Sequence, residues 1–256
     1  MIELMKETAR EAGKLMLEYR DAAIHQKAGH FNFVTDADVA VEQLIRDRLL
    51  TAFPEAKFFA EEQENDPLTD APTFVVDPID GTLNYMRHRN CSTVSIGYLE
   101  SRQPARAVIY NPFTDELFSA EKGKGAFLNG KPIHVSDTPF ENALVIMGTS
   151  PYDLELSEQS MNAGREFLRQ AGDLRRTGSA CAELCDLACG RGEIFFELRL
   201  RPWDYAAGAL IVTEAGGCFF SLGHDAPWFE TPAGVMACNQ PCREDALRIL
   251  REQTGC

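Results

Sequence analysis

The stretch from Phe74 to Tyr85 constrains the fold more than any other part of the chain. It begins with a short apolar run, 74–76, of the kind that forms a buried strand. Asp77 and Asp80 follow with a proline between them, and Gly81-Thr82 then suits the start of a short helix. Two carboxylates beside free backbone N–H groups favour the joint binding of a divalent cation and a phosphate. The same residues are also typical of a turn and a helix N-cap, so the motif alone leaves both interpretations open.

Two further acidic sites are predicted at the ends of other elements. Glu61 and Glu62 come directly after the short apolar strand 57–60, and Asp204 precedes the apolar helix 206–212. Adjacent acids are usually solvated, and an aspartate at a helix start is usually a cap. Three such sites together nevertheless indicate a shared metal centre. There the Ile79 carbonyl would lie between the two carboxylates of the first motif.

The hydrophobic pattern changes character about halfway along the chain. The first part predicts two helices against a largely antiparallel sheet, and the second part alternates strands and helices as an α/β unit does. We therefore expect a layered α+β / α/β chain with two halves, residues 1–135 and 136–256. The expected helices are 1–20, 35–49, 154–170, 179–189, 203–215 and 244–252; the expected strands are 57–60, 92–99, 105–110, 116–120, 143–147, 172–176, 194–197, 218–221 and 235–238, with a loop or hairpin at 27–34 and a hairpin at 123–130.

Charge and composition exclude several classes of function. The chain of 256 residues has a formal net charge of −14, which disfavours binding to nucleic acid. No apolar run approaches the ~20 residues of a membrane span. The N-terminus is charged and amphipathic, unlike a signal peptide, so we expect a cytoplasmic protein.

The eight cysteines predict no zinc site, because Cys-x2-Cys pairs are absent. In a cytoplasmic protein we expect reduced thiols. Cys181, Cys185 and Cys189 are spaced to lie on one helix face, which favours buried thiols. Cys256 ends the chain, where we expect an exposed thiol without an assigned role.

Taken together, these motifs resemble the inositol monophosphatase family. The resemblance is carried by Glu61-Glu62, by 77–82, by Trp203-Asp204 and by 214–217, and it runs from Lys27 to Gly217. That family comprises magnesium-dependent, lithium-sensitive phosphatases related to fructose-1,6-bisphosphatase. The resemblance implies alternating helix and sheet layers, a homodimer, and two or three Mg²⁺ ions, with Mn²⁺ as a substitute. It further implies hydrolysis of inositol monophosphate, or of a similar small sugar or polyol phosphate, by metal-activated water.

The resemblance also implies a role for individual residues. Those implied to bind metal are Glu61, Asp77, Asp80 and Asp204, with the carbonyl of Ile79. Those implied to help activate water are Glu61, Thr82 and Asp38. Glu62 would lie next to the metal ligands without binding metal itself. Those implied to bind phosphate or substrate are Gly81, Thr82, Gly178, Ser179, Ala180, Glu197 and Lys27.

The turn after Tyr85 departs from the family pattern. It reads Met86-Arg87-His88-Arg89-Asn90, and Arg199 and Arg201 approach the same region. Surface charge or a subunit contact is one interpretation, and recognition of a second anionic group is the other. The second would favour a 3'(2'),5'-bisphosphate nucleotidase, which carries a similar basic turn. A fructose-1,6-bisphosphatase or a histidinol-phosphatase of the same superfamily is a separate alternative. A protein-binding regulatory partner without catalysis is a further alternative.

Overall fold

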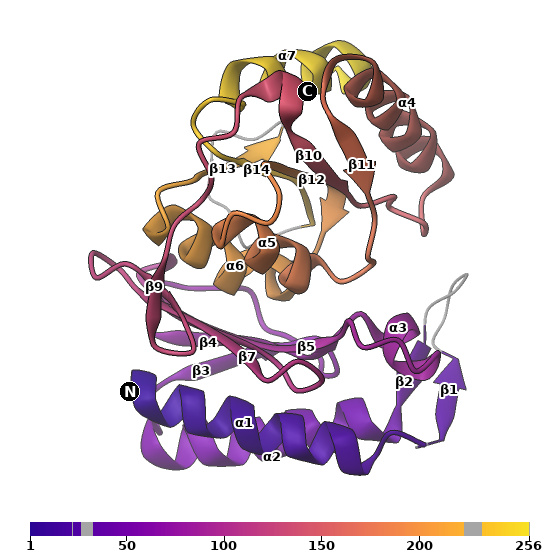
Figure 1. Ribbon diagram of the computed structural model, residues 1–256. Helices are drawn as coiled ribbons and strands as arrows, with labels where there is room; N and C mark the ends of the chain where they lie inside the picture. The colour runs from indigo at the N-terminus through magenta and orange to yellow at the C-terminus, as the bar shows by residue number, and fades with distance from the viewer. Residues whose placement is uncertain (22, 27–32, 223–231, 256) are drawn as a thin grey trace.

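The structure, a computed structural model, describes residues 1–21, 23–26, 33–222 and 232–255. It has five layers (Figure 1). Helices α1 (Ile2–Glu18) and α2 (Asp36–Ala52) cover the outer face of a seven-stranded sheet. Helices α5 (Ala180–Ala188) and α6 (Pro202–Glu214) lie between that sheet and a five-stranded sheet, and α4 (Leu154–Gln170) and α7 (Arg243–Thr254) close the other side. The predicted layered fold is confirmed.

The seven-stranded sheet is largely antiparallel, as predicted, and its strands follow one another in chain order. β3 and β4 run parallel, and each later strand runs antiparallel to its neighbour. The strands are β3 (Lys57–Ala60), β4 (Thr73–Asp80), β5 (Thr93–Glu100), β6 (Gln103–Asn111), β7 (Glu116–Glu121), β8 (Ala126–Leu128) and β9 (Lys131–Ile133).

Two short hairpins differ from the expected ranges. Asn129 and Gly130 both have positive φ, as a two-residue hairpin turn requires, but the strands they join are β8 and β9. The predicted range of 123–130 therefore began and ended too early. Near the N-terminus, β1 (Ile24–Gln26) pairs antiparallel with β2 (Phe33–Thr35), which makes a hairpin whose connection, 27–32, lies outside the described residues.

The five-stranded sheet is mixed. Its spatial order is β11-β10-β12-β14-β13, in which β10 runs parallel to both of its neighbours and the other pairs are antiparallel. Alternation of strands and helices predicted these elements but not their directions. The strands are β10 (Leu144–Met147), β11 (Asp173–Arg175), β12 (Ile194–Leu200), β13 (Cys218–Leu222) and β14 (Ala233–Cys238).

Helix α6 lies where both sheets can cover it. Its residues from Tyr205 to Val212 are all buried, which explains why its sequence is apolar on every face. The helix starts at Pro202, so Asp204 falls in its first turn beside the end of β4. Helices α5 and α6 contact strands of both sheets. The division into residues 1–135 and 136–256 stays a prediction.

Most thiols on the predicted cysteine stripe are buried. Cys181 and Cys185 are buried and Cys189 is partly buried, and burial raises the pKa of all three thiols. Cys256 lies outside the described residues. Among the helices that the structure describes, none is long and apolar enough to cross a bilayer.

Candidate active site

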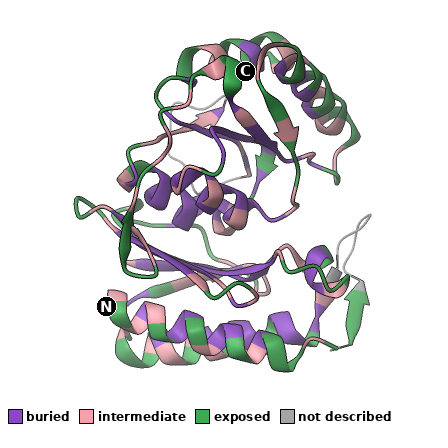
Figure 2. Cartoon of the chain, in the orientation of Figure 1, coloured by how far each residue is buried: buried purple, intermediate pink, exposed green. Residues whose placement is uncertain are grey.

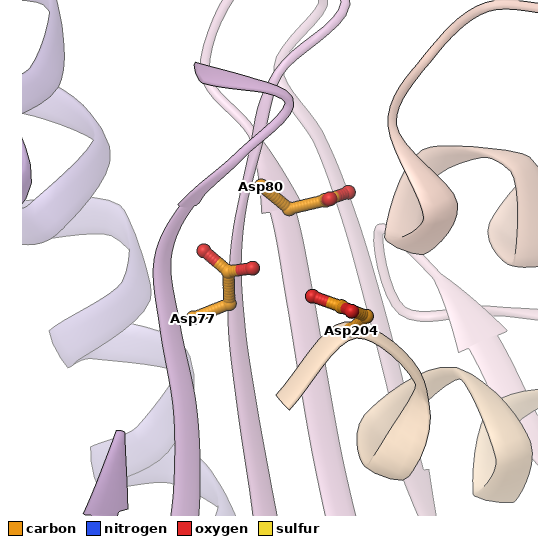
Figure 3. Close-up of side chains that lie close together, drawn as sticks. All are labelled: Asp77, Asp80 and Asp204. Carbon is orange, nitrogen blue, oxygen red and sulfur yellow. The ribbon is translucent and has the colours of Figure 1, made fainter. Parts of the chain in front are cut away.

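Three of the predicted metal ligands converge at the end of β4. Asp77 and Asp80 come from that strand and Asp204 from the first turn of α6, and their side chains lie close together (Figure 3). Each offers an oxygen within 4.8 Å of the other two. Asp77 and Asp80 are buried and Asp204 is partly buried. The acids are therefore brought together inside the protein rather than spread over its surface.

A β-bulge makes this convergence possible. In a regular strand, side chains three residues apart point to opposite faces. Here Asp77 lies opposite Ser95 and Asp80 opposite Thr93, so three steps along β4 match two steps along β5. The extra residue turns both carboxylates to one side. Pro78 lies within the bulge, where a missing N–H removes no regular ladder bond.

Each aspartate has one oxygen fixed by a backbone N–H. Asp77 Oδ1 accepts from Ile79 N at 3.0 Å, and Asp204 Oδ2 accepts from Arg201 N at 2.6 Å. Asp80 Oδ2 accepts from Cys181 N at 2.8 Å and also from the Ser179 hydroxyl, both at the N-terminus of α5. The carboxylates are thus held in place before any ion binds, and the α5 dipole favours the charge of Asp80.

The electrostatics of the cluster fit a bound cation. The pKa of Asp77 is raised well above its ordinary value by burial and then by the charges of Glu61, Asp80, Asp204 and Asp38. Burial and the charge of Asp80 likewise raise the pKa of Asp204 well above its usual range. Burial raises the pKa of Asp80, although the bonds from Ser179 and Cys181 oppose that shift. A divalent cation would offset this repulsion, and oxygen-only donors suit Mg²⁺ or Mn²⁺.

Glu61 lies near enough to take part. It is partly buried just beyond β3, and its charge acts on both Asp77 and Asp204. The backbone N–H of the neighbouring Glu62 donates to Glu42 Oε2 at 2.8 Å, which ties this segment to α2. The separate roles predicted for the two glutamates stay predictions.

The Gly81-Thr82 segment turns sharply after β4. Gly81 has a φ of +82° and precedes the short helix α3 (Thr82–Met86). The Thr82 hydroxyl donates to the carbonyl of Ile79 at 3.2 Å. Asp38 is buried in the first turn of α2, where its Oδ2 accepts from Thr35 N at 2.7 Å and Thr35 Oγ1 at 2.6 Å. The charge of Asp38 still reaches Asp77, but its predicted partnership with Thr82 stays a prediction.

The predicted substrate residues have different environments. Ser179 is 1% exposed, caps α5 and donates its hydroxyl to Asp80, and its predicted role in binding substrate stays a prediction. Ala180 is buried and Gly178 is partly buried. Glu197 on β12 accepts from Ser150 N at 3.1 Å, and burial followed by the charge of Glu183 raises its pKa to about 8. Lys27 lies outside the described residues.

Two residues near the site were missed by the sequence analysis. Asn84 Nδ2 donates to the carbonyls of Cys91 at 2.8 Å and Thr177 at 3.0 Å. Glu183 Oε1 accepts from the backbone N–H groups of Thr177 and Gly178, at 2.5 and 3.0 Å. Burial raises the pKa of Glu183 to about 7. Glu183 lies one helical turn after Ser179, and that spacing could have identified it.

The basic residues after Tyr85 are partly engaged elsewhere. Arg20, just beyond α1, donates to His88 Nδ1 at 3.2 Å and to Asn90 Oδ1 at 3.0 Å. Arg199 pairs with Asp153 at 3.1 Å, at the start of α4. All four arginines of this set are exposed: Arg87, Arg89, Arg199 and Arg201. These contacts favour the surface interpretation for His88 and Arg199.

Comparison with known proteins gives a consistent result. The model of the inositol monophosphatase family matches residues 1–254. Inositol monophosphatase 3 of Solanum lycopersicum is 40% identical, over 98% of this chain and 96% of that protein. The Nus factor SuhB of Escherichia coli K12 is 35% identical, over 99% and 96% of the two chains. The crystal structure of the extragenic suppressor protein suhB from Bartonella henselae matches with a TM-score of 0.89 at 30% identity, covering 98% of each chain.

Proposed function

This chain belongs to the inositol monophosphatase family, and from that premise we propose that it is a Mg²⁺-dependent phosphomonoesterase. The proposed substrate is inositol monophosphate or a similar small sugar or polyol phosphate, which would make the protein an inositol-phosphate phosphatase. The observation that carries the proposal is the buried cluster of Asp77, Asp80 and Asp204. Its mutual repulsion is unfavourable unless a cation is bound, so the arrangement is better suited to binding than to stability.

The proposed roles follow from where the side chains lie. Asp77, Asp80 and Asp204, with Glu61 and the carbonyl of Ile79, would hold two or three Mg²⁺ ions, and Mn²⁺ would substitute for them. Bound ions would supply charge neutralisation at the phosphate and a lowered pKa of water. The backbone N–H groups of Gly81 and Thr82 would orient the phosphate.

The remaining groups would handle water and substrate. Asp38, Thr82 and Glu61 would orient the attacking water, and the carboxylate of Glu61 or Asp38 would take up its proton. Glu197 would contact a substrate hydroxyl. With a pKa of about 8 it is largely protonated near neutral pH, so it can donate as well as accept a hydrogen bond. Lys27 would add positive charge on the phosphate side, and Gly178 and Ala180 would border the substrate.

A substrate panel tests the proposal. Phosphate release is measured with and without Mg²⁺ on inositol 1-phosphate, 3'-phosphoadenosine 5'-phosphate, fructose 1,6-bisphosphate and histidinol phosphate. We expect Mg²⁺-dependent release that is highest with inositol 1-phosphate and that falls when Li⁺ is added. A clear preference for either bisphosphate would replace the substrate assignment. That result would also favour the interpretation in which Arg87 and Arg89 bind a second anionic group of the substrate.

A regulatory role is the second candidate, because a relative of 35% identity is named as a Nus factor. That role would require binding to a protein complex, and it can coexist with catalysis. The net charge of −14 disfavours direct binding to nucleic acid, so we propose none, and we propose a cytoplasmic homodimer. Absence of phosphate release on the whole panel under every metal would favour the regulatory role.

A further inference from the structure

Three cysteines share the core layer beneath α7. Cys218 begins β13, Cys238 ends β14, and Cys242 is the N-cap of α7. Cys238 and Cys242 belong to the hydrophobic core that the five-stranded sheet forms with α4 and α7, and Cys218 packs against that core. β14 is buried along almost all of its length (Figure 2). All three thiols are free, and the proposed phosphatase chemistry uses none of them.

Cys218 and Cys238 stand directly opposite each other. The antiparallel register of β13 and β14 pairs Cys218 with Cys238 and continues with Phe219 and Ala237. Residues paired in this way have Cα atoms about 4.5–5.5 Å apart and side chains on the same face of the sheet. A disulfide requires a Cα separation of roughly 4.4–6.8 Å. The backbone therefore already holds these two residues at the separation that a disulfide needs.

The thiols of this pair also interact directly. Burial raises the pKa of Cys238, and the Cys218 thiol raises it further through its charge and a hydrogen bond. Cys242 acts on Cys238 by charge alone, and its Sγ donates to the Thr138 carbonyl at 3.7 Å. The described residues bring three possible metal ligands together only at the aspartate cluster, so the three sulfurs do not converge as metal ligands would. Cys218 and Cys238 are therefore the pair suited to bond formation.

The two members of the pair differ in their access to solvent. Cys218 is partly exposed and Cys238 is fully buried, so a small oxidant reaches Cys218 first. The exposed Arg243 adds positive charge nearby: its Cζ lies 5.2 Å from the centre of the Phe220 ring, and its charge lowers the pKa of Cys238 against the effect of burial. Positive charge beside a thiol favours the thiolate, which is the reactive form.

We propose that Cys218 and Cys238 form a site of reversible oxidative modification, at which a peroxide produces a disulfide. The Cys218 thiolate attacks one peroxide oxygen, so that an S–O bond forms and the O–O bond breaks. The hydroxide that leaves takes up the proton released by Cys218 and becomes water. The Cys238 sulfur then attacks the sulfur of the sulfenic acid, so that the S–S bond forms and the S–O bond breaks. The second oxygen leaves as water with the proton of Cys238, and thiol–disulfide exchange with a reduced thiol reverses the modification.

The disulfide would close the β13–β14 hairpin at its open end. Cys238 lies three register positions from Val235, which pairs with Glu197 of the proposed substrate site. That is roughly 10 Å along the strand, so the bond forms outside the site. Its formation can be measured in a protein without phosphatase activity, and the two proposals therefore fail independently.

Peptide mapping of the full chain tests the proposal. The folded, reduced protein is treated with equimolar hydrogen peroxide, free thiols are blocked with N-ethylmaleimide, and the chain is cut with trypsin and a glutamate-specific protease. Cleavage after Glu230 separates Cys218, in peptide 215–230, from Cys238, in peptide 231–243. We expect these two peptides to be linked within one chain, and a dithiol reductant to release them.

Variants assign the bond, because peptide 231–243 also contains Cys242. Cys242→Ser should keep the link, whereas Cys238→Ala should lower the linked fraction at least about 10-fold. Cys218→Ala changes a partly exposed position and should have the same effect if Cys238→Ala fails to fold. Thermal unfolding in reductant checks each fold. Three results would overturn the proposal: a wild type without the link, a link that Cys242→Ser abolishes, or a link found only between two chains on a non-reducing gel.

Discussion

The hydroxyl of Ser179 donates to the carboxylate of Asp80 across 99 residues of sequence. The same Asp80 oxygen accepts from Cys181 N, so the first turn of α5 is attached to the end of β4 at two points. Ser179 also accepts from Ala182 N, so it is the N-cap of that helix. One side chain therefore stabilises α5 and positions a proposed metal ligand.

Replacing this hydroxyl should affect both stability and metal binding. Ser179→Ala is expected to lower the free energy of unfolding by about 1 kcal/mol, the usual effect of losing a cap. It should also weaken Mn²⁺ binding, measured by calorimetry, by roughly 10-fold, because Asp80 loses a charge-assisted bond. Ser179→Thr keeps the hydroxyl and should recover most of the loss. If Ser179→Ala binds Mn²⁺ as tightly as the wild type, Ser179 is a cap alone.

Asp80→Asn should separate catalysis from folding. The amide keeps an oxygen for Cys181 N but removes one charge from the cluster. We expect turnover to fall by at least about 10³-fold. In EDTA, the melting temperature should equal or exceed that of the wild type, since a buried repulsion is relieved. A folded Asp80→Asn protein with near-normal Mg²⁺-dependent turnover would contradict the metal assignment.

Gly81 can be tested against a matched glycine. Gly81 and Gly123 both have positive φ, +82° and +76°. A Cβ on Gly81 would lie 3.1 Å from the Cys91 carbonyl oxygen and from Ser179 Cβ, whereas one on Gly123 would meet nothing within 4 Å. Gly123→Ala should cost about 1 kcal/mol of stability and leave turnover unchanged. Gly81→Ala should lower stability further and turnover by about 10²-fold, since it displaces the site. Equal effects of the two variants on turnover would argue against this.

Glu183 should make stability depend on pH. Burial raises its pKa from 4.5 to about 7 in the folded state, so the folded protein holds this proton more tightly than the unfolded chain does. The contribution of Glu183 to the free energy of unfolding is therefore fully present below pH 4.5 and is lost as the pH rises toward about 7. Glu183→Gln keeps an oxygen for Thr177 and Gly178 and should reduce this loss by up to about 3 kcal/mol.

The measurement is urea unfolding in EDTA at several pH values through that window. Glu197 and the three aspartates Asp77, Asp80 and Asp204 should account for the slope that remains, because burial raises the pKa of Glu197 to about 8 and raises the pKa of the aspartates too. Glu155→Gln, which removes one exposed carboxylate of α4, is the control and should leave the slope unchanged. An unchanged slope in Glu183→Gln would show that Glu183 is already ionised in the folded protein at low pH.

Features that depend on neighbouring residues in the chain could be predicted from the sequence. The apolar run before Asp77 predicted the buried strand, and Asp204 before an apolar helix predicted its place in a first turn. The sequence also predicted that Asp77, Asp80 and Asp204 lie close together, because each of them was placed at the end of a strand or the start of a helix. Local pattern sufficed here since burial, helix starts and turns depend on neighbouring residues.

Relations between distant segments were not predictable in the same way. The partner of Ser179 depends on how α5 packs against β4, and the mixed directions of the five-stranded sheet depend on its connections. The bulge at Pro78 is a matter of register between two strands, which a single strand does not encode. Asn84 was missed because its amide donates to the carbonyl of Thr177, 93 residues away. Glu183 differs, since it accepts from Thr177 and Gly178 only a few residues before it, and local spacing could have identified it.

The placement of Asp204 on a helix between the two sheets also bears on how the chain folds. Asp77 and Asp80 come from the first sheet, and Asp204 meets them only when α6 packs against that sheet. Packing of α6 against that sheet therefore brings like charges together, and their repulsion opposes this step of refolding. A divalent cation present during refolding should accelerate this step, and a chelator should slow it. The metal would then act as a folding cofactor before it serves in catalysis.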